Sequence, residues 1–217
     1  MWTSSGSRGS RGKAGRMRIK PQGEGARAAR LTRGVVSGLA AVAVGVAVAT
    51  VAPGAAWAGD LNIQQEKQQQ NQWCWAASGL TIAKFLGKGN IDQNGFCNIS
   101  RGRPQTGRCP NQAGYLQWVQ RGFQALGLSP GVVGSPLAYA SLKSQIDARK
   151  PVQTGIYWTA GGGHSQVIYG YDDASQSVSY GDPWPSSPTY SEMSYSQYRS
   201  NRQFRWAEAL SQIGGVR

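Results

Sequence analysis

The sequence predicts an α+β fold, in which helices come first along the chain and an antiparallel sheet follows. Two observations support this fold class. Apolar residues recur at helical spacing in three segments between residues 74 and 149, and after residue 151 they occur in short runs separated by turn residues. Helices followed by strands are typical of α+β proteins.

The first quarter of the chain has the composition of a leader segment. Residues 1–34 hold nine Lys/Arg and one acidic residue, a seventeen-residue apolar run follows, and Ala56 and Ala58 form a small-x-small site. This order predicts a secretory signal peptide over residues 1–58, cut after Ala58, and one folded domain over residues 59–217. A retained membrane anchor is the alternative, although the apolar run is at the short limit for a span.

The folded domain is only mildly basic once the leader is set aside. The whole chain has a net charge of +13, whereas residues 59–217 carry fourteen Lys/Arg and nine Asp/Glu, a net charge of +5. They contain no concentrated basic stripe, which argues against nucleic-acid binding. We expect a secreted, extracellular monomer with no stable membrane association after cleavage. Met17 is an alternative start within the leader.

Three segments predict helices because their apolar residues recur every three or four positions. Gly87 and Gly127 end the first two, and Pro151 follows the third. Residues 60–72, before the first helix, are polar, and we expect them to be extended. Residues 90–110 are rich in Gly, Asn, Arg and Pro, so we expect a loop there. The predicted helices cover residues 74–86, 113–126 and 136–149.

Four segments predict strands. Gly161–Gly163 make a turn after the first of them, and Asp172–Ser175 make a turn after the second. Pro183 and Pro185 interrupt the pattern after the third. The predicted strands cover residues 152–158, 164–171, 177–181 and 203–210.

The folded domain holds three cysteines, an odd number for an exported chain. Cys97 and Cys109 both lie in the predicted loop, so we expect a disulfide between them that pins a segment with little to bury. Cys74 is then the unpaired thiol.

Cys74 lies between two tryptophans at the start of the first predicted helix. The positive end of the helix dipole favours the thiolate at this position, and the thiolate is the nucleophilic form of cysteine. An upstream amide side chain, Gln68 or Gln70, is placed to donate a hydrogen bond to a developing oxyanion together with the Cys74 N–H. Spacing alone does not choose between the two glutamines.

His164 is the only histidine in the chain, so any imidazole base must be this residue. A surface histidine at a hairpin mouth is the alternative, but an unpaired cysteine at a helix start favours a thiol–imidazole pair. Asp182 ends the strand after the histidine strand, where a carboxylate can orient the ring. Asp182 also reads as the start of an Asp-Pro turn. Asp172 and Asp173 are less suitable because they lie at the far end of the histidine strand.

These motifs resemble papain-like cysteine proteases, most closely their bacterial secreted and effector-type branch, the AvrRpt2-like and C39-like peptidases. The resemblance covers most of residues 64–185. It implies helices packed on an antiparallel sheet with the active-site cleft between them. It also implies that Cys74 is the nucleophile, His164 the base, Asp182 the orienting acid and Gln68 the oxyanion donor. The residues that carry it are Gln68, Trp73-Cys74-Trp75-Ala76-Ala77, the Gly-rich turn into His164, and Gly181-Asp182-Pro183-Trp184.

The sequence therefore predicts a secreted cysteine endopeptidase that acts on protein or peptide substrates. Trp73, Trp75, Trp158 and Trp184 are candidates for lining the cleft. A cell-wall cysteine amidase, a transferase and a non-catalytic module on the same scaffold are the alternatives. We expect no cofactor and no metal, because one histidine and a bridged cysteine pair leave too few ligands.

Overall fold

The computed structural model of the chain describes residues 58–216, so residues 1–57 of the predicted leader lie outside the described residues. The helices are α1 (Cys74–Phe85), α2 (Gln93–Ser100), α3 (Leu116–Ala125), α4 (Tyr139–Asp147) and α5 (Tyr195–Arg199). The strands are β1 (Ala58–Asp60), β2 (Leu128–Ser129), β3 (Val132–Gly134), β4 (Val152–Trp158), β5 (Gly163–Asp172), β6 (Ser177–Gly181), β7 (Tyr190–Ser194), β8 (Phe204–Ser211) and β9 (Gly214–Val216).

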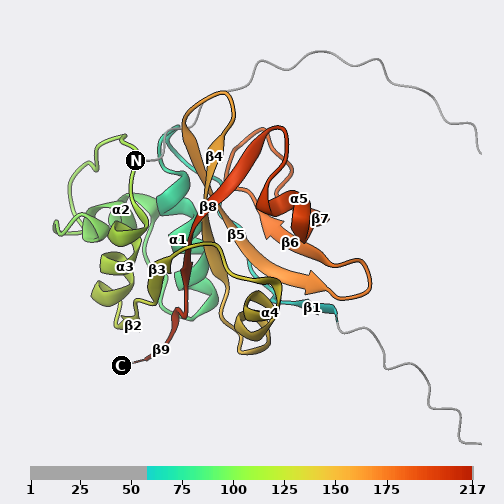
Figure 1. Cartoon of the computed structure of the whole chain (residues 1–217). Coiled ribbons are helices and arrows are strands. Elements are labelled where there is room, and N and C mark those ends of the chain that lie inside the picture. Colours follow the sequence, from blue (N-terminus) through green and yellow to red (C-terminus); the bar gives the residue numbers. More distant parts are fainter. Residues whose placement is uncertain (1–57, 217) are drawn as a thin grey trace, which may run out of the picture. The chain divides into compact units, whose positions relative to one another are not determined.

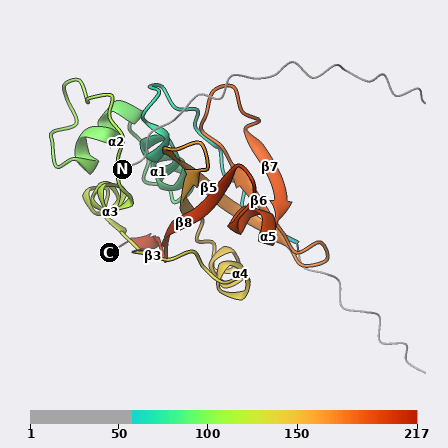
Figure 2. The same ribbon diagram turned by 45° about the horizontal axis from the view of Figure 1, so that its top comes forward.

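The main sheet has seven antiparallel strands in the order β3-β8-β4-β5-β6-β7, with β1 paired to β5. β2 and β9 form a separate two-stranded sheet. In Figures 1 and 2, α1, α2 and α3 gather on one side of β4, β5 and β8, and β6, β7 and α5 lie on the other. This arrangement is the α+β layout predicted from the sequence, with helices packed on an antiparallel sheet.

Helix α1 is buried on all sides, whereas the sequence pattern predicts one inward face. Every residue from Cys74 to Ala83 is buried. The helix accepts close neighbours because several of its side chains are small: a Cβ at Gly79 would lie 2.6 Å from Cε1 of Phe96. The helix therefore runs between the other helices and the sheet.

Helix α2 corrects the prediction of a loop over residues 90–110. Asp92 caps the helix by accepting a hydrogen bond of 2.6 Å from the Gly95 N–H. Phe96, Cys97 and Ile99 are buried against the core, so tertiary packing outweighs the weak helical pattern of this segment. The irregular parts of this range are residues 90–92 and 101–110.

The sequence pattern also misses β7 and α5. β7 is an edge strand that pairs only with β6 in the main sheet, and its residues are at least partly exposed, so they carry no clear alternation. α5 has five residues, of which Tyr198 alone is buried. None of the helices in the described part of the chain has the length and hydrophobicity that crossing a bilayer requires.

Candidate active site

The sheet brings His164 and Asp182 together. His164 is the second residue of β5, and Asp182 directly follows β6, the antiparallel neighbour of β5. The Nε2 atom of His164 lies 2.7 Å from Oδ1 of Asp182. Both side chains are buried, at 2% and 7% exposure. An ionised carboxylate can only accept, so Nε2 carries the hydrogen in this contact.

Cys74 reaches the same imidazole from α1. It is the first residue of that helix, it is not in a disulfide, and its thiol lies close enough to His164 to raise the pKa of the imidazole. Because Nε2 faces Asp182, Nδ1 is the nitrogen left for the thiol. His164 therefore lies between Cys74 and Asp182.

Buried side chains fix α1 against the strand that carries the imidazole. The Gln153 amide on β4 donates to the carbonyl oxygen of Trp75 at 3.0 Å and to Oγ of Ser165 at 2.9 Å. The Ser78 hydroxyl on α1 donates to the carbonyl oxygen of Ser165 at 3.1 Å. These bonds flank the contact between Cys74 and His164 and hold the two groups in register.

The environment of His164 favours its charged form. Burial alone lowers the pKa of the imidazole, but the hydrogen bonds and charges of Asp182 and Cys74 outweigh it and raise the pKa from 6.5 to about 10. Burial raises the pKa of Asp182, and the hydrogen bond and charge of His164 reverse this, so the net shift is downward. The imidazolium and the carboxylate thus stabilise one another.

Asp182 is held by further donors. Gln166 Nε2 lies 2.9 Å from Oδ2, and the Trp184 N–H lies 2.8 Å from Oδ1. The Lys67 ammonium donates to the carbonyl oxygens of Asp182, Trp184 and Ser187 at 3.0, 2.9 and 2.8 Å. Burial lowers the pKa of Lys67, and the charge of Asp182 opposes this shift. Lys67 therefore fastens the loop that follows β6.

Two partly exposed tryptophans flank the imidazole. The Trp158 ring stacks on His164, with ring centroids 5.9 Å apart and planes 22° from parallel. The Trp184 ring meets it edge-on at 6.4 Å and 84°. Both rings therefore lie beside His164, and their expected role in lining a substrate cleft stays a prediction.

The structure places Trp73 and Trp75 in the hydrophobic core, away from the role expected for them in the cleft. Trp75 is fully buried and packs edge-on against Trp118 at 5.6 Å. The Trp73 and Trp75 ring N–H groups each donate at 3.1 Å, to the carbonyl oxygens of Pro110 and Gln112 respectively. These rings support the backbone on both sides of Cys74.

The structure distinguishes the two glutamines left open by their spacing. The Gln68 side chain is 4% exposed, and its Nε2 donates to the carbonyl oxygen of Gln70 at 2.8 Å, whereas the Gln70 side chain is exposed. The backbone N–H of Gln68 donates to the carbonyl oxygen of Pro183 at 2.8 Å, which places Gln68 beside the Asp182 loop. Of the two, only Gln68 has a buried side chain, and its role as oxyanion donor stays a prediction.

Asp172 and Asp173 do not reach His164. Oδ1 of Asp172 accepts from the Ala174 N–H at 2.7 Å within the turn after β5, and Asp173 is paired with Lys143. The far end of β5 is therefore occupied by structural contacts. Within the described residues, no group of three or more His, Cys, Asp or Glu side chains is arranged to hold a metal.

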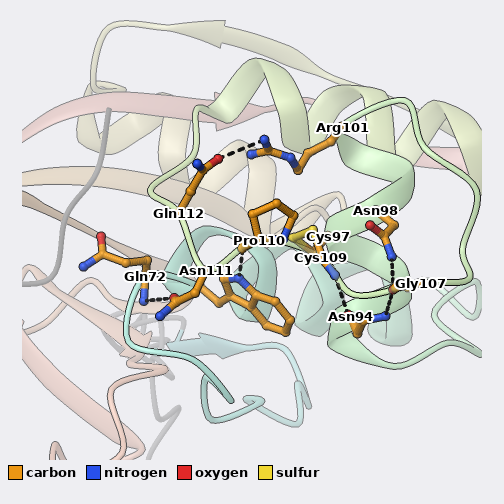
Figure 3. Close-up of a disulfide and its surroundings, with 12 residues drawn as sticks. Gln72, Asn94, Cys97, Asn98, Arg101, Gly107, Cys109, Pro110, Asn111 and Gln112 are labelled. Carbon is orange, nitrogen blue, oxygen red and sulfur yellow. Dashed lines mark hydrogen bonds between the residues drawn. A yellow bond between two sulfur atoms is a disulfide. The ribbon is translucent and has the colours of Figure 1, made fainter.

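Figure 3 shows the disulfide and its surroundings, which include Gln72, two residues before Cys74. Cys97 on α2 is bonded to Cys109, whose N–H donates to Asn94 Oδ1 at 2.9 Å. Two residues further along, Oδ1 of Asn111 accepts from the Gln72 N–H at 3.1 Å. The bridge therefore anchors residues 109–112 to α2, and these residues in turn support the approach to Cys74.

We expect the double variant Cys97→Ser/Cys109→Ser to lose about 3 kcal/mol of unfolding free energy, because the cross-link no longer restricts the unfolded chain. Chemical denaturation measures this loss. We also expect several-fold slower turnover at temperatures where the variant is still folded. Cys74→Ala is the matched control for the stability measurement, because it removes a thiol and keeps the bridge. Unchanged stability in the double variant would contradict the anchoring role.

Several residues that hold the site are not predicted from the sequence. Gln166 could have been predicted from its spacing, because it lies two positions after His164 and so points to the same face of β5. Lys67 and Gln153 contact the site through backbone carbonyl groups. Every residue has such a group, so the sequence does not indicate these contacts. Tyr198 comes from α5, a helix that the pattern does not predict.

The chain is similar to known proteins in sequence and in fold. The family model of the papain-like cysteine protease AvrRpt2 matches residues 57–203. A putative C39-like peptidase from Bacillus anthracis is similar in fold, with a TM-score of 0.50 and 15% identity over 73% of this chain and all of that one. A double glycine motif protease from an AMS/PCAT transporter, crystallised with the leader peptide, gives a TM-score of 0.45 and 16% identity over 70% of this chain and 93% of that one.

The search of curated proteins found no match. The family model spans more than half of the chain and includes Cys74, His164 and Asp182. The chain therefore belongs to the family of the papain-like cysteine protease AvrRpt2 and is a cysteine-type peptidase.

Proposed function

We propose that this chain is an exported cysteine endopeptidase that hydrolyses peptide bonds through Cys74, His164 and Asp182. The placement of His164 between the Cys74 thiol and the Asp182 carboxylate carries the proposal. It joins the one unpaired cysteine of the described residues to the only histidine of the sequence. A buried thiol and imidazole in contact form the activated nucleophile that thiol acyl transfer requires.

The reaction proceeds through an acylated cysteine. The Cys74 thiolate attacks the carbonyl carbon of the scissile bond, and the carbonyl oxygen becomes an oxyanion. The His164 imidazolium gives its Nδ1 proton to the leaving amine as the C–N bond breaks, which leaves a thioester on Cys74. Neutral His164 then takes a proton from water, whose oxygen attacks the thioester and releases the acid. The Cys74 thiolate is restored and His164 is again charged.

Asp182 keeps the imidazole in the useful orientation throughout this cycle. Its contact with Nε2 turns Nδ1 toward the thiol and stabilises the imidazolium that protonates the amine. The N–H of Cys74 has no partner within the helix because it belongs to the first turn of α1. Together with the Gln68 amide, this N–H supplies the hydrogen bonds to the oxyanion.

Access to the thiol requires a local movement, since Cys74 is fully buried. A cavity of about 440 Å³ lies among residues 66–93, but none of Cys74, His164 and Asp182 lines it. Trp158 and Trp184 are the partly exposed groups against His164, so their displacement opens the site to a peptide. The predicted leader and the Cys97–Cys109 bridge support export to an oxidising compartment.

The test compares the wild-type chain with Cys74→Ala on a complex protein mixture. Mass spectrometry of the released peptides should show new internal cleavages with the wild type and none with the variant. The variant is a close control because it removes only a sulfur atom and leaves His164 and Asp182 in place. Protein taken from the medium of an exporting host tests the leader as well, because its first residue should lie near Gly59.

Equal cleavage by both chains would refute the proposal. Release of cell-wall fragments without any cleavage of denatured protein would also refute it and would indicate an amidase of the same chemistry.

A further inference from the structure

We propose that Gln166 and Tyr198 are positioning residues of the active site, in which Tyr198 orients the Gln166 amide and this amide fixes the Asp182 carboxylate toward His164. The inference rests on the proposed function and adds two residues to it. Neither side chain touches the reacting atoms, so both act through Asp182.

The Asp182 carboxylate is held at both oxygens. Oδ1 accepts from His164 at 2.7 Å and from the Trp184 N–H at 2.8 Å. Oδ2 accepts from Gln166 Nε2 at 2.9 Å. A carboxylate bonded at one oxygen alone can swing about its Cβ–Cγ bond, whereas bonds at both oxygens prevent this rotation. Gln166 is the side chain that holds the second oxygen.

The hydrogen bonds of this network can run in only one direction. An ionised carboxylate donates nothing, so Gln166 must turn its NH₂ group toward Asp182 and its Oε1 away from it. Oε1 then accepts from the Tyr198 hydroxyl at 2.9 Å. The Thr154 hydroxyl lies 2.8 Å from the Tyr198 oxygen and 3.3 Å from the backbone carbonyl oxygen of Gln166, and it can donate to either. Tyr198 and Gln166 therefore each donate toward the carboxylate.

Tyr198 is what keeps the amide from turning over. Without its hydroxyl, Oε1 of Gln166 would lack a donor, and a rotated amide would press an oxygen against Oδ2 of Asp182. Burial raises the pKa of Tyr198, so the hydroxyl retains the hydrogen that it donates. An amide held in one orientation is the condition for a fixed carboxylate.

The network is isolated from solvent. Gln166 is 3% exposed, and Thr154 and Tyr198 are fully buried. The Tyr198 ring packs against Tyr180 and Phe204, with centroids 5.0 and 5.7 Å away. Solvent is thus poorly placed to replace a lost partner, and each broken bond leaves a buried group unsatisfied. Helix α5 buries no other side chain, so delivering Tyr198 to this network is its main contribution to the core.

The experiment measures the rate of Cys74 alkylation by iodoacetamide against pH, together with kcat and KM on a cleaved peptide. We expect Gln166→Met to lower kcat about tenfold and Tyr198→Phe about threefold, with KM within twofold of the wild type. We expect the alkaline limb of the alkylation profile to move to lower pH, because a loosely held carboxylate stabilises the His164 imidazolium less. If Gln166 and Tyr198 had a purely structural role, the variants would change the melting temperature and leave the alkaline limb of the alkylation profile at its wild-type pH.

Other charged groups near the carboxylate are left intact by these variants. Lys67 contacts the backbone carbonyl of Asp182, and Tyr180 lies within electrostatic reach of the carboxylate. Tyr171→Phe is the matched control, because it removes a buried hydroxyl that donates at 2.8 Å to another carboxylate, that of Asp147. We expect it to keep the wild-type pH profile and kcat.

A double variant tests whether Tyr198 acts through Gln166. Gln166→Met/Tyr198→Phe should be no slower than Gln166→Met alone, since the amide that Tyr198 orients is already absent. Additive losses in kcat would overturn the inference, as would folded single variants with the wild-type pH profile. Tyr198→Phe keeps the ring and its packing, so it remains informative if Gln166→Met fails to fold.

Alkylation needs no peptide, which separates this inference from the proposed function. A wild-type chain that cuts no protein, combined with a shifted alkylation limb in both variants, refutes the peptidase proposal and supports the positioning network. Peptide cleavage by the wild type, combined with an unshifted alkaline limb of the alkylation profile in both variants, supports the peptidase proposal and refutes the positioning network.

Discussion

His164→Gln should lower kcat/KM by about 10³- to 10⁴-fold, because it removes the group that protonates the leaving amine and later activates water. Glutamine preserves most of the side-chain volume and an amide that can donate to Asp182, so the loss reports chemistry more than packing. The measurement is the rate of peptide hydrolysis, with circular dichroism and thermal unfolding to show that the variant folds. Since the sequence has no second histidine, no neighbouring imidazole can take over.

The wild-type pH profile gives the same residue a second test. The pKa of His164 is raised from 6.5 to about 10, so its positive charge contributes stability that is fully present below pH 6.5 and is lost as the pH rises through about 10. Hydrolysis should fall over the same alkaline range, since the imidazolium supplies the proton. Unimpaired hydrolysis by a folded His164→Gln variant would contradict the assignment of the base.

Trp75→Ala should cost about 3–5 kcal/mol of unfolding free energy, the range for a fully buried large aromatic side chain replaced by alanine. The ring is 0% exposed, packs against Trp118 and donates to the carbonyl oxygen of Gln112, so its removal leaves a cavity and an unpaired acceptor. This loss is a large share of the roughly 5–15 kcal/mol that stabilises a typical domain. Urea denaturation at several temperatures measures it.

Trp158→Ala is the control for this prediction, because it makes the same change at a partly exposed ring that stacks on His164. It should unfold at nearly the wild-type urea concentration but hydrolyse peptides more slowly. The opposite pattern, a stable and inactive Trp75→Ala beside a fully active Trp158→Ala, would restore Trp75 as a substrate contact and remove Trp158 from the site.

The parts of the site that the sequence predicts are those with rare residues or strong local patterns. Cys74 is identified because the number of cysteines after residue 58 is odd, and His164 because it is the only histidine in the sequence. Asp182 is identified because turn residues predict that its strand pairs with the strand of His164. The structure brings these three side chains together as expected. The central strands and the first helix are likewise strongly patterned, so their bounds agree closely with the prediction.

The remainder depends on tertiary contacts that no local pattern encodes. Helix α2 forms because Phe96 and Ile99 find a core to pack against, although the segment is rich in glycine and polar residues. Lys67 holds the Asp182 loop through three backbone carbonyl groups, which any sequence presents. The burial of Trp75 is similar, since a tryptophan next to the nucleophile suits a cleft and a core equally well from its sequence alone.

The Cys97–Cys109 bridge has a practical consequence for handling the enzyme. Thiol peptidases are kept active with reducing agents that protect the nucleophile from oxidation, but here the same reagent acts on the bridge that supports the approach to Cys74. Cys97 and Cys109 are at most 2% exposed, so a small dithiol can reduce the disulfide only when the segment around it opens. Activity should therefore pass through a maximum as the reductant concentration rises, and preparations made under strongly reducing conditions will understate what the oxidised fold can do.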